Sequence, residues 1–259
     1  MKYQIMRVWF LAGFSIFLLA AAVAPVATAA DISIGGGAGM APDYEGSDDY
    51  EFVPIPFARV AFDNGMFVTL QGLTAKANLI PSKIWRLGPM YNYRPSRSGV
   101  DNNKVDRLSN VSDANEVGGF GGFDYNNWFG FLEFLADVGE AHDGWLGTAR
   151  GGYNYVASKS WTLSFGLSTT YASGDYMSTY FGVDGADAAR SGLRTFNADE
   201  GLKDVAFDLG IGCKFTDHIS GRFIGQYKML INDADESSPV TNEGSQHQLF
   251  GGLLVVYTF

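Results

Sequence analysis

Carboxylates are concentrated near the start of the chain, where they could bind a metal ion. Residues 43–51 include five acidic side chains, and 232–239 holds a similar acidic run. Oxygen-rich loops of this kind can coordinate a hard cation such as Ca²⁺. The spacing does not match an EF-hand, so solvated acidic loops are the expectation and cation binding is the alternative.

Histidines are the next candidates for chemistry, and the chain has three, His142, His218 and His247. A hydrolase would need a nucleophile beside such a base. The sequence has no G-x-S-x-G, C-x-x-C or H-x-x-x-H pattern, and its glycine-rich stretch 35–39 lacks the rest of a phosphate-binding loop. A non-enzymatic protein without cofactor or metal is therefore predicted, with a hydrolase as an alternative.

Charged side chains also recur on the polar faces of alternating stretches. In a barrel these faces would point inward, where mixed charges either form an ion-pair network or line a solute path. Unpaired buried charges are costly, so we expect the network. The predicted inward charges are Arg59, Arg86, Glu133, Asp137, Arg150, Asp204, Asp208, Arg222 and Lys228.

The elements that must position these charges are β-strands. In 160–173, apolar side chains at odd positions alternate with Thr, Ser and Gly at even ones, and 201–213 and 217–230 repeat the pattern. Eleven strands are expected near 31–40, 52–62, 66–78, 84–94, 115–124, 127–138, 144–157, 160–173, 201–213, 217–230 and 246–259. Bacterial barrels use even numbers. We predict twelve strands, with 66–79 split near Gln71-Gly72, and ten as the alternative.

The two ends of the chain indicate where such a barrel resides. Residues 1–30 resemble a cleaved signal peptide: Lys2 and Arg7 precede an apolar run that ends in small residues, and 31–259 would form one domain. At the other end Tyr257 and Phe259 close an almost purely apolar strand face, as in barrels that meet outer-membrane lipid. These two aromatic residues are the predicted assembly signal.

The net charge, the cysteine count and the lengths of the links between strands limit the possible partners, cross-links and orientation of the barrel. Without Lys2 and Arg7 the 28 acidic residues face 16 basic ones, which argues against nucleic-acid partners. The single cysteine, Cys213, excludes an internal disulfide. Short links at 124–127, 157–160 and 214–217 alternate with long polar ones at 94–115, 174–200 and 231–245. If Phe259 is periplasmic, all three long links are extracellular.

Several stretches together resemble the MipA/OmpV family of outer-membrane proteins, named after the MltA-interacting protein. They are 37–50, 53–56, Tyr-Phe-Gly-Val at 180–183, 189–194, 201–204, 233–240 and the closing 257–259. The resemblance implies a Gram-negative outer-membrane barrel that brings a lytic transglycosylase together with a murein synthase. A small-solute or stress-responsive channel is the alternative. The motif residues expected to fold the loops at the barrel mouth, or to contact a ligand or partner, are Tyr44, Gly46, Ser47, Tyr180, Phe181, Gly182, Ser238 and Pro239.

Overall fold

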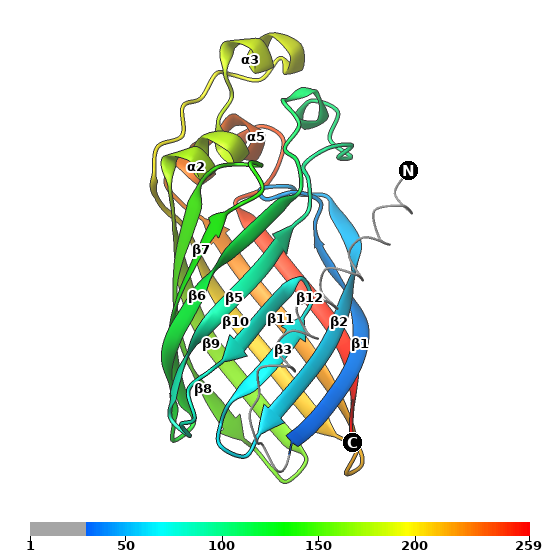
Figure 1. Ribbon diagram of the computed structural model, residues 1–259. Helices are drawn as coiled ribbons and strands as arrows, with labels where there is room; N and C mark the ends of the chain where they lie inside the picture. Colours follow the sequence, from blue (N-terminus) through cyan, green and yellow to red (C-terminus); the bar gives the residue numbers. More distant parts are fainter. Residues whose placement is uncertain (1–29) are drawn as a thin grey trace.

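The computed structural model describes residues 30–259, which form a closed antiparallel β-barrel (Figure 1). The expected signal peptide lies outside the described residues, apart from Ala30, where the first strand begins. Every strand pairs with its neighbours in the sequence, and β12 pairs with β1 to close the ring. The strands are β1 (Ala30–Pro42), β2 (Tyr50–Phe62), β3 (Phe67–Gln71), β4 (Thr74–Asn78), β5 (Trp85–Arg94), β6 (Ala114–Tyr125), β7 (Trp128–Asp137), β8 (Trp145–Val156), β9 (Trp161–Ala172), β10 (Gly201–Lys214), β11 (Ile219–Leu230) and β12 (His247–Thr258).

The twelve-strand prediction is confirmed, and ten strands is wrong. The stretch 66–79 splits at Gly72, which has a φ of +58°, into the short strands β3 and β4. β2 pairs with β3 only from Phe57 onward. The Gly72 N–H donates to the Pro56 carbonyl, so the main-chain edge of Pro56 faces this short hairpin. Pro54, two residues earlier, faces the edge above the hairpin, where its missing N–H leaves no ladder bond broken.

The outward-facing side chains of the wall are apolar, and the inward-facing ones are mostly polar, apart from an apolar cluster of Ile55, Phe57, Leu254 and Val256. Along β9 the odd-numbered side chains point outward and the Thr, Ser and Gly positions point into the lumen. Leu253 on β12 is 67% exposed on the outer face, while its neighbour Leu254 is buried. An apolar exterior over a polar interior is the arrangement of an outer-membrane barrel. No helix among the described residues is long and apolar enough to cross a membrane.

The two ends of the barrel differ in the length of their links. The start of β1 and Phe259 lie at the end with the short turns, the periplasmic end in such barrels (Figure 1). The opposite, extracellular end holds the long links, where the sequence led us to expect irregular loops. Three of these links instead contain the helical segments η1 (Val105–Arg107), α2 (Gly174–Phe181), α3 (Gly185–Ser191), α4 (Asp233–Glu236) and α5 (Ser238–Thr241).

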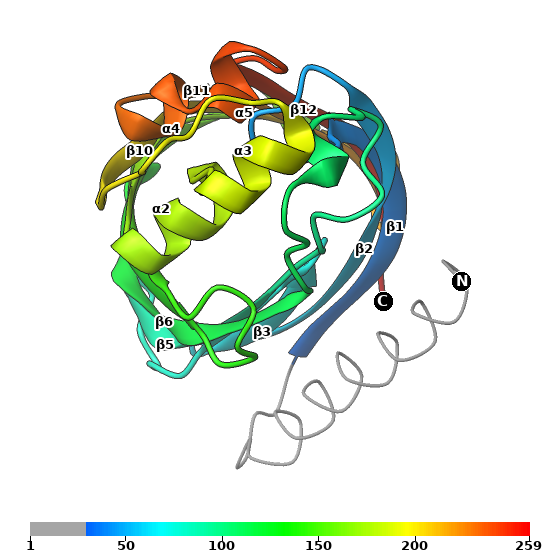
Figure 2. The ribbon, with the colours of Figure 1, turned by 90° about the horizontal axis from the view of Figure 1, so that it is seen from above.

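Helix α2 lies across the extracellular opening, as the view along the barrel shows (Figure 2). Its Tyr176, Met177 and Phe181 are fully buried and pack with Leu230 of β11 and Val240 of α5. A helix with one apolar face needs a surface to bury that face against, which the barrel mouth supplies. We call α2 together with the loop 43–49 the plug.

Candidate functional site

A group of buried and half-buried polar side chains joins the plug to the wall beneath it. We call it the plug network: Glu45, Arg94, Glu116, His142, Tyr176, Lys203, Asp204 and Lys228. Its members come from loops 43–49 and 138–144, helix α2, and strands β5, β6, β10 and β11. The network therefore ties the plug to widely separated parts of the wall.

Glu45 is the centre of one half of the network. Its Oε1 lies 2.5 Å from the Lys203 Nζ and 3.5 Å from the Lys228 Nζ, and its Oε2 accepts a hydrogen bond of 2.6 Å from the Tyr176 hydroxyl. Burial alone would raise the pKa of Glu45, but the charges of Lys203, Lys228 and Arg94 hold it well below its ordinary value. Burial raises the pKa of Tyr176, so its hydroxyl stays protonated and donates to Glu45.

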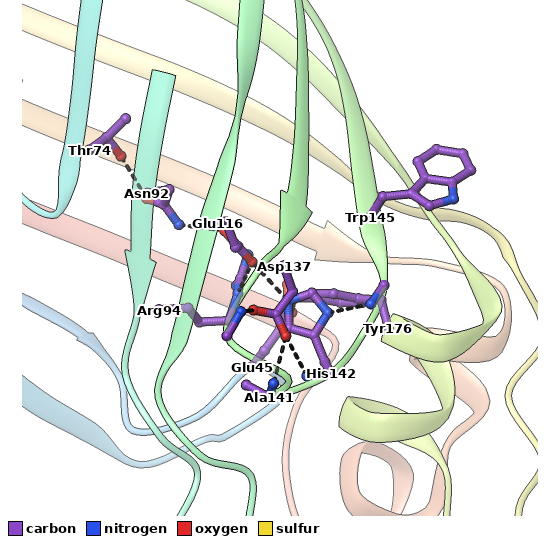
Figure 3. Close-up of polar contacts among 12 residues, drawn as sticks. Glu45, Thr74, Asn92, Arg94, Glu116, Asp137, Ala141, His142, Trp145 and Tyr176 are labelled. Atoms are coloured by element: carbon purple, nitrogen blue, oxygen red, sulfur yellow. Dashed lines mark hydrogen bonds and ion pairs between the residues drawn. The ribbon is translucent and has the colours of Figure 1, made fainter. Parts of the chain in front are cut away.

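The other half is built around Glu116, which is completely buried on β6. Arg94 Nε donates to its Oε1 at 2.9 Å and Asn92 Nδ2 to its Oε2 at 2.7 Å (Figure 3). Thr74 continues the chain by donating to Asn92. The guanidinium of Arg94 also lies 5.1 Å from the centre of the Tyr176 ring, which couples this half of the network to α2.

His142 has a structural position in this network. Its Nδ1 accepts a hydrogen bond from the Gly144 N–H, so its Nε2 carries the proton that faces Glu116 Oε1 at 3.2 Å. Both ring nitrogens are occupied, and no hydroxyl or thiol of a described residue is hydrogen-bonded to either. His218 contacts the Thr258 carbonyl and His247 the Tyr227 hydroxyl, at opposite ends of the barrel. The three histidines thus share no site.

The charges of the plug network balance one another. Lys203 and Lys228 face Glu45 and Asp204, and the Lys203 Nζ also lies 2.7 Å from the Asp204 Oδ2. Arg94 and Glu116 form the remaining pair, and the hydrogen bonds of His142 define a neutral ring. Buried charges are tolerated when they are paired and hydrogen-bonded. The arrangement can therefore hold the plug in place, and it presents neither a nucleophile nor a free base.

Four charged members of the network were not among the predicted inward charges: Glu45, Arg94, Glu116 and Lys203. The register of β10 shifts between Leu202 and Asp204, and this bulge turns both Lys203 and Asp204 inward. Strict alternation would place Lys203 on the lipid face, so its inward position cannot be predicted from the period of the strand. Glu45 was recognised only as part of an acidic loop. Among residues 30–259, no group of three His, Cys, Asp or Glu side chains lies close enough to hold a metal ion.

The predicted inward charges lie inside the barrel, but not all of them form ion pairs. Glu133 pairs with Lys76 at 2.5 Å, and Arg150 faces Asp208 at 3.7 Å. Asp204 and Lys228 belong to the plug network. Asp137 instead accepts backbone N–H groups of 139–143 and so shapes that loop.

The three remaining arginines depart from the predicted ion-pair network. Arg86 donates to backbone carbonyls of the adjacent 79–84 link. Arg59 and Arg222 contact aromatic rings rather than carboxylates. Alternation identified these positions as inward but contains no information on how they pair, because the pairing depends on side chains from distant strands.

The first group of motif residues folds the loop between β1 and β2 against β12. Gly46 has a φ of +103°, and a Cβ there would lie 2.6 Å from Val240 Cγ2. The Gly46 N–H donates to Gln248 Oε1, and the side-chain amide nitrogen of Gln248 donates in turn to the Ser47 carbonyl. Tyr44 is buried and donates to the Glu243 carbonyl. This packing directs Glu45 into the lumen.

The other motif residues shape the plug and the links beside it. Tyr180 and Phe181 are buried on α2, and Gly182 caps the helix by donating to the Ser178 carbonyl. Ser238 is fully buried and donates to the Arg194 carbonyl, while Pro239 lies buried at the start of α5. The structure therefore brings all eight motif residues to the extracellular mouth.

A groove of about 760 Å³ lies on the extracellular side of the plug. Arg97 and residues from 109–111, 178–187 and 195–197 line it, including Gly182 and Val183 of the Tyr-Phe-Gly-Val motif. Arg97 is buried and donates to the carbonyls of Tyr180 and Ser109. This arginine joins the link between β5 and β6 to α2, which adds a second layer above the plug.

Comparisons with known proteins place the chain in a family. The family described as MltA-interacting protein MipA matches residues 34–259. Comparison with curated protein sequences gives no match.

Among solved structures, the chain is similar to the KdgM porin, with 11% identity over 88% of this chain and 99% of that chain and a TM-score of 0.42. The translocator domain of the autotransporter NalP from Neisseria meningitidis has 12% identity, covering 96% of this chain and 95% of that chain, with a TM-score of 0.44. The COG4313 outer membrane channel from Pseudomonas putida F1 has 12% identity, covering 92% and 97%, with a TM-score of 0.42. The family match covers nearly all the described residues, and the chain belongs to the MipA family of outer-membrane β-barrel proteins.

Proposed function

We propose that this protein is a non-enzymatic scaffold that holds murein-remodelling enzymes at the outer membrane, with a lytic transglycosylase and a murein synthase as its partners. The family name supplies the interacting enzyme. The observation that carries the proposal is the plugged mouth: buried apolar side chains of α2 and a balanced charge network occupy the opening through which a solute would pass.

The partner surface must lie at the periplasmic end, because murein and its enzymes are in the periplasm. The most extended link there is 79–84, where Leu79, Lys83 and Ile84 are exposed. Phe215, in the turn after β10, is also exposed at this end. Apolar side chains beside a single charge provide a contact surface of the kind that protein interfaces use. We therefore assign partner contact to these periplasmic links rather than to the motif-rich loops outside.

Recovery of the partner from detergent extracts tests this proposal. The wild-type chain should retain a lytic transglycosylase, and the variants Lys83→Glu and Phe215→Ser should retain less. Arg107→Glu is the matched control, because Arg107 is exposed at the extracellular end. Recovery of no transglycosylase, under conditions that keep known murein complexes intact, contradicts the proposal. So does equal recovery with all three variants.

A small-solute channel is the second candidate, and the polar lumen below the plug favours it. The pairs Lys76–Glu133 and Arg150–Asp208 lie there among Ser, Thr and Asn side chains. Displacement of α2 would connect this polar interior with the outside. Conductance of the purified protein in planar bilayers is the measurement, and a folded barrel that stays silent excludes a channel.

A further inference from the structure

Two lumen arginines near the periplasmic end of the barrel, Arg59 and Arg222, contact aromatic rings and have no acidic partner among residues 30–259. Arg59 lies three residues before the end of β2, and Arg222 three residues after the start of β11. Among the described residues, no carboxylate or carbonyl oxygen accepts a hydrogen bond from either guanidinium, whereas Lys76, Arg94, Arg150, Lys203 and Lys228 all have acidic partners. The positive charge of the lower lumen is therefore not neutralised by direct ion pairs.

The surroundings of these two arginines increase this imbalance. The guanidinium of Arg59 is repelled by the positive charges of Arg222 and Arg86. One carboxylate attracts it, that of Asp124, which is exposed at the end of β6. Arg86 satisfies its own donors with backbone carbonyls of the 79–84 link. Like charges held close together in a partly desolvated lumen repel one another, and an anion between them would relieve that repulsion.

Aromatic rings hold the guanidinium groups in place and leave donors free. The Arg59 guanidinium lies 4.3 Å from the centre of the Phe67 ring, and that of Arg222 lies 4.8 Å from the centre of the Phe57 ring. Stacking uses the face of a guanidinium, so the N–H groups along its edge can still bind an oxyanion in bidentate fashion. The Phe120 ring, 6.5 Å from that of Phe67, extends the apolar lining.

We propose that Arg59 and Arg222, with Arg86 beside them, form a binding site for a small organic anion that enters from the periplasm. The guanidinium edges would hold its carboxylate or phosphate oxygens, and the phenyl rings would contact its carbon skeleton. The plug closes the opposite end, so the periplasmic end is the way in. Arg59 and Arg222 belong to β2 and β11 and are not residues of the proposed partner surface, although Arg86 donates to carbonyls of the 79–84 link.

Binding to the full-length mature barrel, folded in an uncharged detergent, tests the site. The probes are phthalate and sulfate, which are both dianions at neutral pH but differ in their aromatic ring. Calorimetric titration at constant ionic strength should show phthalate binding, with sulfate at least fivefold weaker. The double variant Arg59→Gln/Arg222→Gln should bind phthalate at least tenfold more weakly than the wild type.

Lys214→Gln is the matched control, because it removes one positive charge at the periplasmic end of β10 and should change the affinity less than twofold. Heat-modifiable migration on gels verifies that each variant is folded. If the double glutamine variant does not fold, Arg59→Lys/Arg222→Lys keeps the positive charges while removing the planar guanidinium groups. Its affinity for phthalate should still be at least threefold lower than that of the wild type. Absence of phthalate binding, equal affinity for sulfate, or an equal loss with Lys214→Gln overturns the proposal.

Discussion

Replacing Glu45 with glutamine removes the negative charge that joins the plug to the wall, while keeping the size of the side chain. The wild-type group of Glu45, Asp204, Lys203 and Lys228 is neutral. In the variant the two ammonium groups share one carboxylate. Breaking a buried ion pair on one side costs about 3–5 kcal/mol. Because Asp204 still contacts Lys203 at 2.7 Å, we take the lower end, about 3 kcal/mol.

This cost should appear as easier opening of the plug. A loss of about 3 kcal/mol corresponds to roughly a hundredfold change in an equilibrium constant. Hydrogen exchange of the α2 amides, followed by mass spectrometry of peptides covering Gly174–Phe181, should therefore accelerate on the order of a hundredfold in Glu45→Gln. Exchange in the barrel strands should stay slow, since the wall bonds are unchanged.

Two further variants make the measurement decisive. Asp48→Asn removes an exposed carboxylate from the same loop and should leave α2 exchange within about twofold of wild type. Glu45→Gln/Lys203→Gln restores neutrality and should exchange more slowly than Glu45→Gln alone. If Glu45→Gln exchanges at the wild-type rate, or if the double variant opens faster than the single one, the assigned role of the plug network is refuted.

Three other predictions concern the mouth and the last strand. The low pKa of Glu45 means that its stabilising contribution is complete above the ordinary carboxyl value of about 4.3 and is lost as the pH falls below it. The difference in α2 exchange between wild type and Glu45→Gln should be constant from about pH 6 to 8 and disappear in stronger acid; a difference that persists there contradicts this. Gly46→Ala should lower the free energy of opening of the packed extracellular loops by about 1–3 kcal/mol, because Gly46 has a φ of +103° and lies close to a Val240 methyl. Hydrogen exchange of peptides from 231–246 measures this change. Deleting Phe259 removes the terminal ring and the hydrogen bond from the Phe259 N–H to the Ile32 carbonyl. The fraction of barrel assembled in cells, measured by heat-modifiable migration, should therefore fall. Unchanged assembly would argue against Phe259 as part of the assembly signal.

The wall of this barrel could be predicted from the sequence because period-two alternation and link lengths are local signals. Strand 160–173 was identified with its outward face, and the parity requirement correctly split 66–79 into two short strands. Each of these inferences needed only neighbouring residues and the geometry of a closed sheet.

The plug and its network could not be predicted to the same extent, because they depend on contacts between distant segments. Tyr176, Met177, Tyr180 and Phe181 do have helical spacing, and this signal in 174–181 could have indicated α2. The bulge that turns Lys203 inward leaves no periodic trace. The missing partners of Arg59 and Arg222 likewise depend on which side chains other strands bring into the lumen.

Site-specific photo-crosslinking in living cells tests the scaffold role most directly. A photoreactive residue at position 83, on the exposed periplasmic link, should capture a lytic transglycosylase, whereas the same residue at position 107, outside the cell, should not. Both positions are exposed, so both variants should fold and assemble. Of these two positions, only position 83 is expected to give a transglycosylase adduct. Correctly assembled protein that gives no such adduct at position 83, 79 or 215 would contradict it.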